Sequence, residues 1–217
     1  MGFTDLAFQL SAGMARSVGI FALTLLFSLP LGLVVALGRM SRNPLLRTAT
    51  KVYISIMRGT PLVLQLIVVY FGPSLLFGLK LPNYRFTAVI IAFVVNYAAY
   101  FGEIYRSGLQ AIPAGQREAA RVLGYSRGQT FFCILLPQMA RNVLPTVTSE
   151  VITLVKDTSL AYAISYTELF SLAKQIAAAQ TTIVPLFVAG IFYYIFNLVV
   201  AVLMEKVERK MRVGVQA

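Results

Sequence analysis

The sequence predicts an all-α protein that crosses a membrane about five times and forms a single transmembrane domain over residues 1–217. Of its residues 58% are hydrophobic and only 12% are charged, which is too apolar for a soluble domain of this size. Several uncharged runs are long enough to cross about 30 Å of hydrocarbon as helices. The net charge of +11 could suit nucleic acid, but the basic residues lie beside the apolar runs, where membrane topology explains them. No nucleic-acid partner is therefore expected.

Two spans are expected in the first third of the chain. The run over residues 17–38 is uncharged, and Pro30 is expected to kink it because proline removes a helical hydrogen bond. The mixed residues 1–16 before it are expected to form a short segment at the membrane interface. A second span is expected over about 52–79.

Three further spans complete the expected bundle. After a short turn that contains Pro82, a third span covers about 86–106. A fourth apolar region runs over about 131–170, and because polar residues interrupt it we expect a broken helix. An uncharged fifth span covers about 181–204, and a basic tail follows it.

Basic residues are distributed unevenly between the two sides of this arrangement. With five spans, twelve of the nineteen fall on one side. Cytoplasmic loops carry an excess of Lys and Arg. The N-terminus is therefore expected outside, and the C-terminus and the segment over residues 108–130 are expected in the cytoplasm. The twelve are Arg39, Arg42, Arg47, Lys51, Arg106, Arg117, Arg121, Arg127, Lys206, Arg209, Lys210 and Arg212.

The segment over residues 108–130 is the longest charged interval between the predicted spans. Pro113 stands where a helix begins, and Gly124 is placed to end that helix in a left-handed conformation. Ser126 and Gln129 have the spacing of a capping box, which predicts the start of a second helix. Pro137 is expected to interrupt this second helix.

This segment resembles the EAA motif of the membrane subunits of ABC importers. In that family the motif forms the coupling helix, which docks on a separate ATP-hydrolysing subunit. The resemblance implies that the matching residues make the ATPase-coupling contact. The alternative is an amphipathic helix at the bilayer surface, which would leave Gly124 and the later residues of the motif unexplained. The matching residues are Glu118, Ala119, Ala120 and Gly124, then Ile134, Leu136 and Pro137.

Polar residues inside the predicted third and fourth spans form two stripes. Asn96 and Glu103 are seven residues apart, so they share a helix face, and Tyr100 lies between them. Glu150 and Asp157 have the same spacing in the fourth region. A central charge costs roughly 2.5–3.5 kcal/mol on insertion scales, so such residues usually face protein or a water-filled path. We predict that these five residues line a substrate pathway, with Glu150 the strongest candidate because it has no adjacent basic residue.

Several of these residues have a structural alternative. Arg106 can pair with Glu103 three residues earlier. Lys156 can neutralise Asp157 locally at the end of a broken helix. Asn96 can join two helices by a hydrogen bond instead of contacting a ligand.

Three further stretches look like the polar amino-acid importer branch of this family. The resemblance implies a five-span permease with the type I ABC importer fold in the bacterial inner membrane, paired as a homo- or heterodimer. It implies ABC ATPase subunits, an extracytoplasmic amino-acid-binding protein and membrane lipid as partners. It also implies a small site for a polar or basic amino acid on the third and fourth spans, at the predicted pathway residues. The stretches are Arg58-Gly-Thr-Pro-Leu62, Gly115-Gln116 and Lys156-Asp157-Thr-Ser-Leu160.

Several chemistries are not expected from this composition. The chain has no His and only Cys133, so neither a metal site nor a catalytic residue is predicted. It has no Gly-x4-Gly-Lys-Ser/Thr motif, so ATP with Mg²⁺ is expected on the partner ATPase, and the chain itself is expected to need no cofactor and to be no enzyme. The main alternative is an ion-driven secondary amino-acid transporter. It would suit the intramembrane carboxylates, but the sequence shows no evident internal repeat and is short for that architecture.

Overall fold

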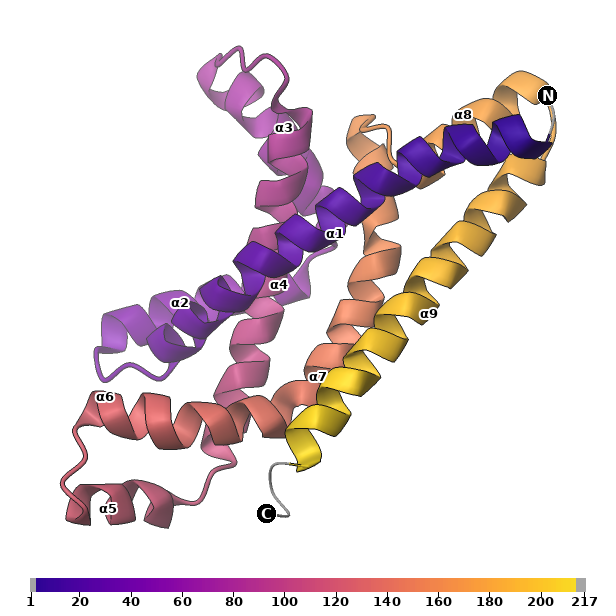
Figure 1. The fold of residues 1–217 in the computed structure, drawn as a ribbon. Helices are drawn as coiled ribbons and strands as arrows, with labels where there is room; N and C mark the ends of the chain where they lie inside the picture. The colour runs from indigo at the N-terminus through magenta and orange to yellow at the C-terminus, as the bar shows by residue number, and fades with distance from the viewer. Residues whose placement is uncertain (1–2, 214–217) are drawn as a thin grey trace.

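The computed structural model describes residues 3–213, which are largely helical and contain no β-strand (Figure 1). The all-α prediction is therefore confirmed for these residues, and the outermost parts of the predicted domain, 1–2 and 214–217, lie outside them. In chain order the elements are α1 (Phe3–Arg39), α2 (Pro44–Gly59), α3 (Leu62–Phe77), α4 (Tyr84–Gln110), α5 (Ala114–Val122), α6 (Arg127–Gln129), a π-helix (Thr130–Leu135), α7 (Leu136–Asp157), a 3-10 helix (Thr158–Ile164), α8 (Leu169–Gln180) and α9 (Val184–Val213).

The helices α1, α4, α7 and α9 form the body of the molecule. α1 lies obliquely across α4, α4 packs against α7, and α7 packs against α9 (Figure 1). α8 packs against α1 and α9 near the N-terminus, whereas α5 and α6 lie at the opposite end. The turn after α1, the α5–α6 segment and the last turns of α9 lie toward this same end. The prediction that most basic residues lie on one side of the membrane requires these three segments to be at the same end of the molecule. That this end faces the cytoplasm stays a prediction.

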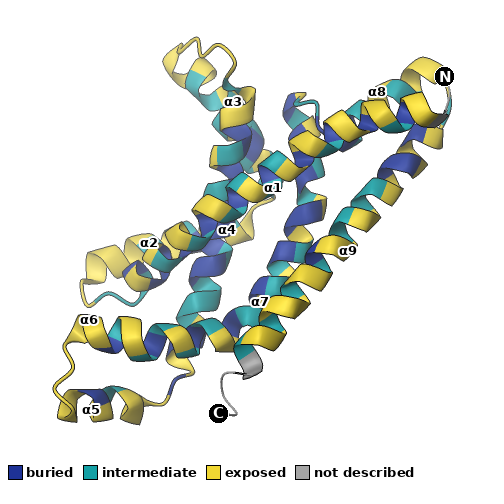
Figure 2. Ribbon diagram, in the orientation of Figure 1, coloured by how far each residue is buried: buried dark blue, intermediate teal, exposed yellow. Residues whose placement is uncertain are grey.

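Three helices of the described residues are long and apolar enough to cross a membrane, namely Thr4–Arg39, Tyr84–Gln110 and Val184–Met211. They contain most or all of the predicted first, third and fifth spans. Much of their outward surface is apolar and exposed (Figure 2). On α9 only 17% of the most apolar window is buried within the chain. Such a surface fits lipid or another protein, because water would not favour it.

The residues before the predicted first span belong to the same helix as that span. α1 is continuous from Phe3 to Arg39, and the position of its first turns at the membrane interface stays a prediction. Leu10 is fully buried and Leu6 is 5% exposed, in a small core that they share with residues of α8 and α9. This tertiary packing extends the helix beyond the apolar run.

The second predicted span, residues 52–79, is divided between two helices, and whether it crosses the membrane once stays a prediction. α2 and α3 meet at an angle of 109° across Thr60 and Pro61. Thr60 is extended, with φ −123° and ψ 147°, as a residue before proline prefers. By length and composition this bent pair is one broken span or a re-entrant loop, so residues 3–213 contain three candidate spans, or up to four.

The fourth apolar region is broken, as predicted, and its main helix is α7. α7 is not among the candidate spans, and it carries Arg141, Glu150, Lys156 and Asp157. It packs between α4 and α9, so its polar side chains can face protein instead of lipid. A fifth crossing made by α7 stays a prediction.

Pro137 does not interrupt the helix that begins after Ser126, which corrects the expectation from the sequence. The chain continues from α6 through the π-helix into α7, with Pro137 in the first turn of α7. The N–H of Leu136 donates to the carbonyl of Phe131, five residues earlier. The wider turn lies directly before the proline, where an ordinary helix would lose a hydrogen bond in any case.

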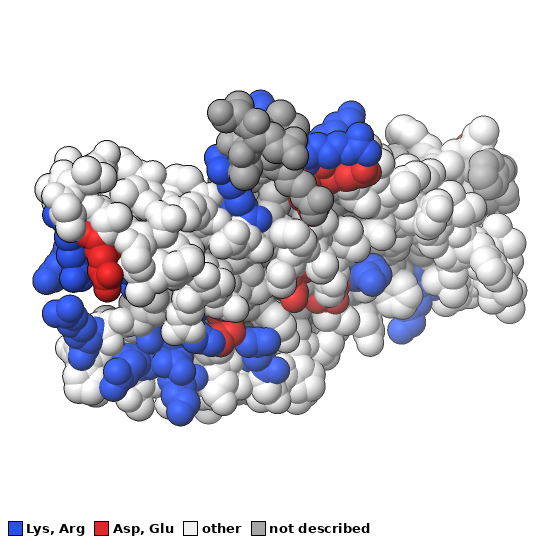
Figure 3. Space-filling model, turned by 90° about the horizontal axis from the view of Figure 1, so that it is seen from below, with Lys and Arg blue, Asp and Glu red and all other residues white. Residues whose placement is uncertain are grey.

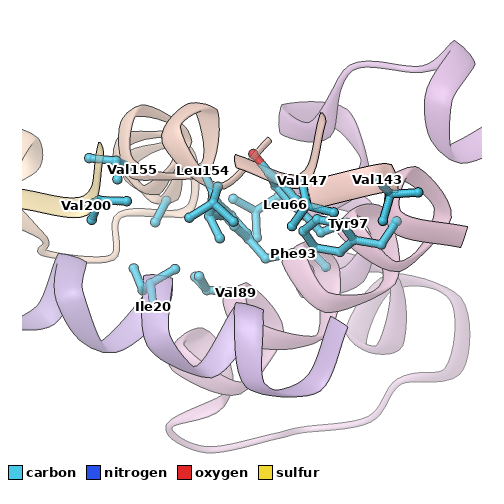
Figure 4. Packing of buried hydrophobic residues seen from close by; sticks show 14 of the residues in the cluster. Ile20, Leu66, Val89, Phe93, Tyr97, Val143, Val147, Leu154, Val155 and Val200 are labelled. Carbon is cyan, nitrogen blue, oxygen red and sulfur yellow. The ribbon is translucent and has the colours of Figure 1, made fainter. Parts of the chain in front are cut away.

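Glycines let α4 approach its neighbours closely. A Cβ on Gly102 would lie 2.6 Å from Cγ1 of Val35 in α1, and a Cβ on Gly108 would lie 2.1 Å from Cγ1 of Val143 in α7. Small residues allow such close contact between membrane helices. Buried apolar side chains such as Phe93 form the main core beside these contacts (Figure 4). α4 is thus held from both sides, and the polar residues along it have fixed positions.

Candidate functional site

A pocket of about 490 Å³ lies between α4 and α7, at the side where α2 ends. We call it the α4–α7 pocket. It brings together three of the five predicted pathway residues, Tyr100, Glu103 and Glu150. Asn96 and Asp157 are not among its lining residues. The lining residues are Arg58, Tyr100, Glu103, Ile104, Arg106, Ser107, Gly108, Ala111, Asn142, Val143, Thr146 and Glu150.

One carboxylate of the α4–α7 pocket is paired within α4. The Nε–H of Arg106 lies 3.0 Å from each carboxylate oxygen of Glu103, and an Nη of the same guanidinium also contacts Glu103. Arg106 also donates to the side chain of Gln110. The predicted alternative, a local pair between Glu103 and Arg106, is therefore confirmed. Both residues nevertheless line the pocket, so the pairing does not remove them from it.

The other carboxylate of the pocket belongs to Glu150 in α7. It faces Arg58, which lies in the last turn of α2. The guanidinium carbon of Arg58 lies 5.2 Å from the ring centre of Tyr100, a distance at which the cation and the ring attract each other. The charge of Arg58 also acts on the Glu150 carboxylate. Within residues 3–213 Glu150 makes no hydrogen bond or close ion pair. The pocket thus holds a positive and a negative group that are not neutralised by direct contact.

Asn96 is buried away from the pocket, where it joins three helices. It is 4% exposed, and its Nδ2 donates to the carbonyl of Met57 in α2 at 3.0 Å and to Oε1 of Gln65 in α3 at 2.9 Å. Gln65 in turn donates to the carbonyl and the hydroxyl of Thr60. These bonds satisfy backbone groups at the bend between α2 and α3. The contacts agree with the alternative that Asn96 joins helices, and its place on the pathway stays a prediction.

Asp157 lies at the end of α7 and accepts a hydrogen bond of 2.7 Å from the hydroxyl of Tyr97 in α4. The side chain of Lys156 is exposed, and residues 3–213 contain no close ion pair between it and Asp157. The local pair considered from the sequence is therefore not formed. Asp157 instead links α7 to α4.

Sequence reasoning missed Arg58 and Asn142 as pocket residues. The sequence identifies Arg58 only as part of a stretch similar to amino-acid importers. Thr146 lies on the same helical stripe as Glu150, four residues before it, as the period of the helix predicts. No signal in the sequence distinguishes Asn142.

The residues that resemble the EAA motif form the expected helix, turn and helix. Pro113 is at the N-cap of α5, one residue before the helix begins. Gly124 has φ +79°, so the predicted left-handed residue is confirmed. Ser126 and Gln129 make both hydrogen bonds of the predicted capping box.

One face of this segment is open. Ala120 is 1% exposed and holds α5 against the rest of the chain, whereas Glu118 and Ala119 are exposed. Two apolar side chains next to them are also exposed, Val122 at 88% and Leu123 at 73%. Exposed apolar residues beside small ones are typical of a surface that another protein covers.

Comparisons with known proteins agree with these features. Residues 28–213 match the family described as the binding-protein-dependent transport system inner membrane component. The arginine transport system permease protein ArtQ of Bacillus subtilis (strain 168) is 37% identical over 201 residues, which cover 92% of this chain and 91% of the relative. The L-cystine transport system permease protein TcyB of the same organism is 35% identical over 205 residues, which cover 93% of this chain and 86% of the relative.

A solved structure has the same fold along almost the whole chain. The crystal structure of an amino acid ABC transporter with histidines matches with a TM-score of 0.84 and 29% identity, over 97% of this chain and 99% of that chain. This similarity confirms the predicted permease fold.

Proposed function

The chain belongs to the family of binding-protein-dependent transport system inner membrane components, and from this premise we propose that it is the permease subunit of an ATP-driven importer for polar amino acids. It would work in the bacterial inner membrane as one of two permease subunits, identical or different. ABC ATPase subunits would hydrolyse ATP with Mg²⁺, and an extracytoplasmic binding protein would deliver the amino acid. The chain itself would transport and not catalyse.

The single observation that carries the substrate class is the mixed charge of the α4–α7 pocket. Arg58 and Glu150 offer a cation and an anion that no direct contact neutralises. An α-amino acid carries a carboxylate and an ammonium group, so it can bind both at once. We infer that Arg58 attracts the carboxylate, and that Glu150 attracts the ammonium group or a cationic side chain. The relatives named for arginine and L-cystine transport agree with this class of substrate.

Coupling follows from the short path between the pocket and the α5–α6 segment. Ser107, Gly108 and Ala111 line the pocket at the end of α4, and α5 begins at Ala114. A displacement of α5 by a partner therefore acts on a wall of the pocket within one helical turn. Gly108 also contacts α7 closely, so α4 and α7 would move together or separate at that point.

The direction of transport would be set by the partners. We infer that closure of the ATPase dimer draws the two α5 helices together and opens the pocket outward, and that hydrolysis reverses this. A ligand or partner shifts such an equilibrium only by its different affinity for the two states. The pocket must therefore bind the amino acid more weakly when it opens inward.

Reconstitution with the partners tests the proposal. The chain is purified with its ATPase and placed in vesicles, and uptake of radiolabelled arginine, glutamine and glucose is measured with the binding protein present. We expect uptake of an amino acid that stops when ATP is withheld, even with an ion gradient imposed. Uptake driven by the gradient without ATP would favour the secondary transporter instead. Stimulation of ATP hydrolysis by glucose alone would contradict the substrate class.

A further inference from the structure

A second pocket, of about 300 Å³, lies behind the α5–α6 segment and is surrounded by arginines. Arg42 comes from the turn after α1, Arg117 and Arg121 come from α5, and Arg127 comes from α6. No acidic residue is among the residues that line it. We call it the arginine pocket. Figure 3 shows the molecule from this end, with several Lys and Arg side chains gathered on the side where α5 and α6 lie.

The arginines are not neutralised elsewhere in the described chain. The close ion pairs of Arg106 with Glu103 and of Arg209 with Glu205 do not involve the arginine pocket. Like charges around one cavity repel each other. Arg117 adds a more specific signal, because its Nε–H is buried and has no hydrogen-bond acceptor, while one Nη donates to the carbonyl of Leu109 at 3.3 Å. A buried donor without an acceptor is costly, so the described chain does not fully satisfy the guanidinium of Arg117.

The other wall of the arginine pocket is apolar. Leu37 of α1, Leu109 of α4 and Leu135 of the π-helix line it together with Phe131. By length and composition, the candidate spans of α1 and α4 end at Arg39 and Gln110, so this wall lies near the ends of both candidate spans. A soluble anion would gain nothing from such a wall, whereas an amphiphile would bury its chain there.

We propose that the arginine pocket binds the phosphate group of an anionic phospholipid, with the guanidinium groups on the headgroup and the apolar wall on the start of an acyl chain. Basic pockets between membrane helices are suited to anionic headgroups. Arginine presents a planar fork of N–H donors that matches phosphate oxygens. The bound lipid would connect the turn after α1 with α5. This site is independent of the transported substrate and requires only that the chain lies in a membrane.

Native mass spectrometry of the full chain in a neutral detergent tests the proposal. Phosphatidylglycerol, phosphatidylcholine with the same acyl chains, and inorganic phosphate are each added at equal concentration. We expect a phosphatidylglycerol adduct at least about tenfold more abundant than the phosphatidylcholine adduct, because each basic residue near an anionic headgroup contributes about 1 kcal/mol. Inorganic phosphate is expected to leave no adduct.

Two double variants show where the lipid binds. Arg42→Gln with Arg127→Gln removes two exposed arginines of the pocket and leaves the anchored Arg117 in place, so the fold should persist. Arg47→Gln with Lys51→Gln removes the same charge from exposed positions on α2. We expect the first pair to lower the phosphatidylglycerol adduct about tenfold and the second pair to leave it unchanged.

The proposal is overturned by equal adducts for the two lipids, or by equal losses in the two double variants. An adduct with inorganic phosphate that the first pair removes would keep the anion site and overturn the lipid as its occupant. Unfolding temperatures of both variants are measured in the same detergent. A lower value for the first pair alone, without loss of the adduct, would also contradict the proposal.

Discussion

Glu168 and Glu150 are the same residue type in the same broken region of the chain, yet their surroundings are opposite. Glu168 is 0% exposed and accepts hydrogen bonds from the N–H groups of Phe170 and Ser171, both at 2.7 Å, and from the hydroxyl of Tyr193 at 3.0 Å. Glu150 is partly exposed in the α4–α7 pocket and makes no hydrogen bond within residues 3–213.

The difference separates a structural carboxylate from an available one. Glu168 caps the start of α8, and Ser17 of α1 lies 3.5 Å from one of its oxygens, so it holds α1, α8 and α9 together. Its oxygens have no capacity left for a ligand. Glu150 keeps its capacity, because it makes no hydrogen bond within residues 3–213 and Arg58 acts on it only through its charge. The number of hydrogen bonds already made, and not burial alone, indicates which carboxylate can serve transport.

The largest effect is expected from Glu168→Ala. The change leaves one buried N–H group, one partly buried N–H group and a partly buried hydroxyl without this acceptor, and a buried group left unpaired costs about 1–3 kcal/mol. We expect unfolding of the purified chain in detergent at a temperature at least several degrees lower, and little protein in the membrane. Glu205→Ala is the control, because Glu205 is exposed and pairs only with Arg209 on the surface. Equal unfolding temperatures for the two variants would show that Glu168 is not structural.

Gly124→Val tests whether an exposed residue of the α5–α6 segment serves transport without serving the stability of the fold. Gly124 has φ +79° and no neighbouring atom within 4 Å of a Cβ at that position, so a side chain meets strain and not crowding. That backbone costs a residue with a Cβ about 1–2 kcal/mol. We expect the α5–α6 turn to change, so that the reconstituted importer hydrolyses ATP but transports roughly tenfold less. The free energy of unfolding in detergent should fall by no more than this cost.

Gly128→Val is the matched control for this coupling variant. Gly128 also has open space around it, but it lies in α6 without a positive φ. Transport with this substitution should stay close to the original. A charge reversal, Glu118→Lys, should resemble Gly124→Val if the exposed face of α5 meets the ATPase. Normal transport with both Gly124→Val and Glu118→Lys would contradict the coupling role.

Glu150→Gln should affect selectivity and not folding. The amide keeps the size of the side chain but removes the charge that would attract a cationic amino acid. We expect uptake of arginine to fall about fivefold, since a partly exposed ion pair contributes up to about 1 kcal/mol, and uptake of a neutral amino acid to fall less. Glu168→Gln, measured per folded molecule, should leave the ratio of the two substrates unchanged. Equal losses of both substrates in Glu150→Gln would assign Glu150 to the structural class.

The sequence could predict local features but not partners that are distant along the chain. The capping box of Ser126 and Gln129 spans three residues, and the left-handed Gly124 belongs to one turn, so local rules were sufficient. Glu168 was missed because Ser17, which it contacts, is 151 residues away. The bend between α2 and α3 lies where Arg58, Gly59 and Thr60 interrupt the apolar pattern before Pro61, but this interruption alone does not give the direction in which α3 leaves α2. The sequence pattern and the residue propensities indicate where helices form. The direction in which one helix leaves another, and the contacts between distant side chains, depend on tertiary packing.

Asn96 gives the smallest and most discriminating test, because it belongs to the predicted pathway but has the contacts of a structural residue. Asn96→Ala removes the donor to Met57 and to Gln65, and Gln65→Ala removes the partner from the other side. We expect each variant to lower the free energy of unfolding by about 1 kcal/mol. Because the two side chains share one hydrogen bond, the double variant should cost less than the two single costs added together.

Transport measurements on these three variants show whether Asn96 is a structural residue like Glu168 or a substrate-contacting residue like Glu150. If Asn96 resembles Glu168, uptake per folded molecule and the preference between arginine and a neutral amino acid stay unchanged in all three variants. If Asn96 resembles Glu150, Asn96→Ala changes the preference while Gln65→Ala does not. The first outcome confines the substrate contacts to the α4–α7 pocket. The second would place the pathway deeper along α4, toward the bend between α2 and α3.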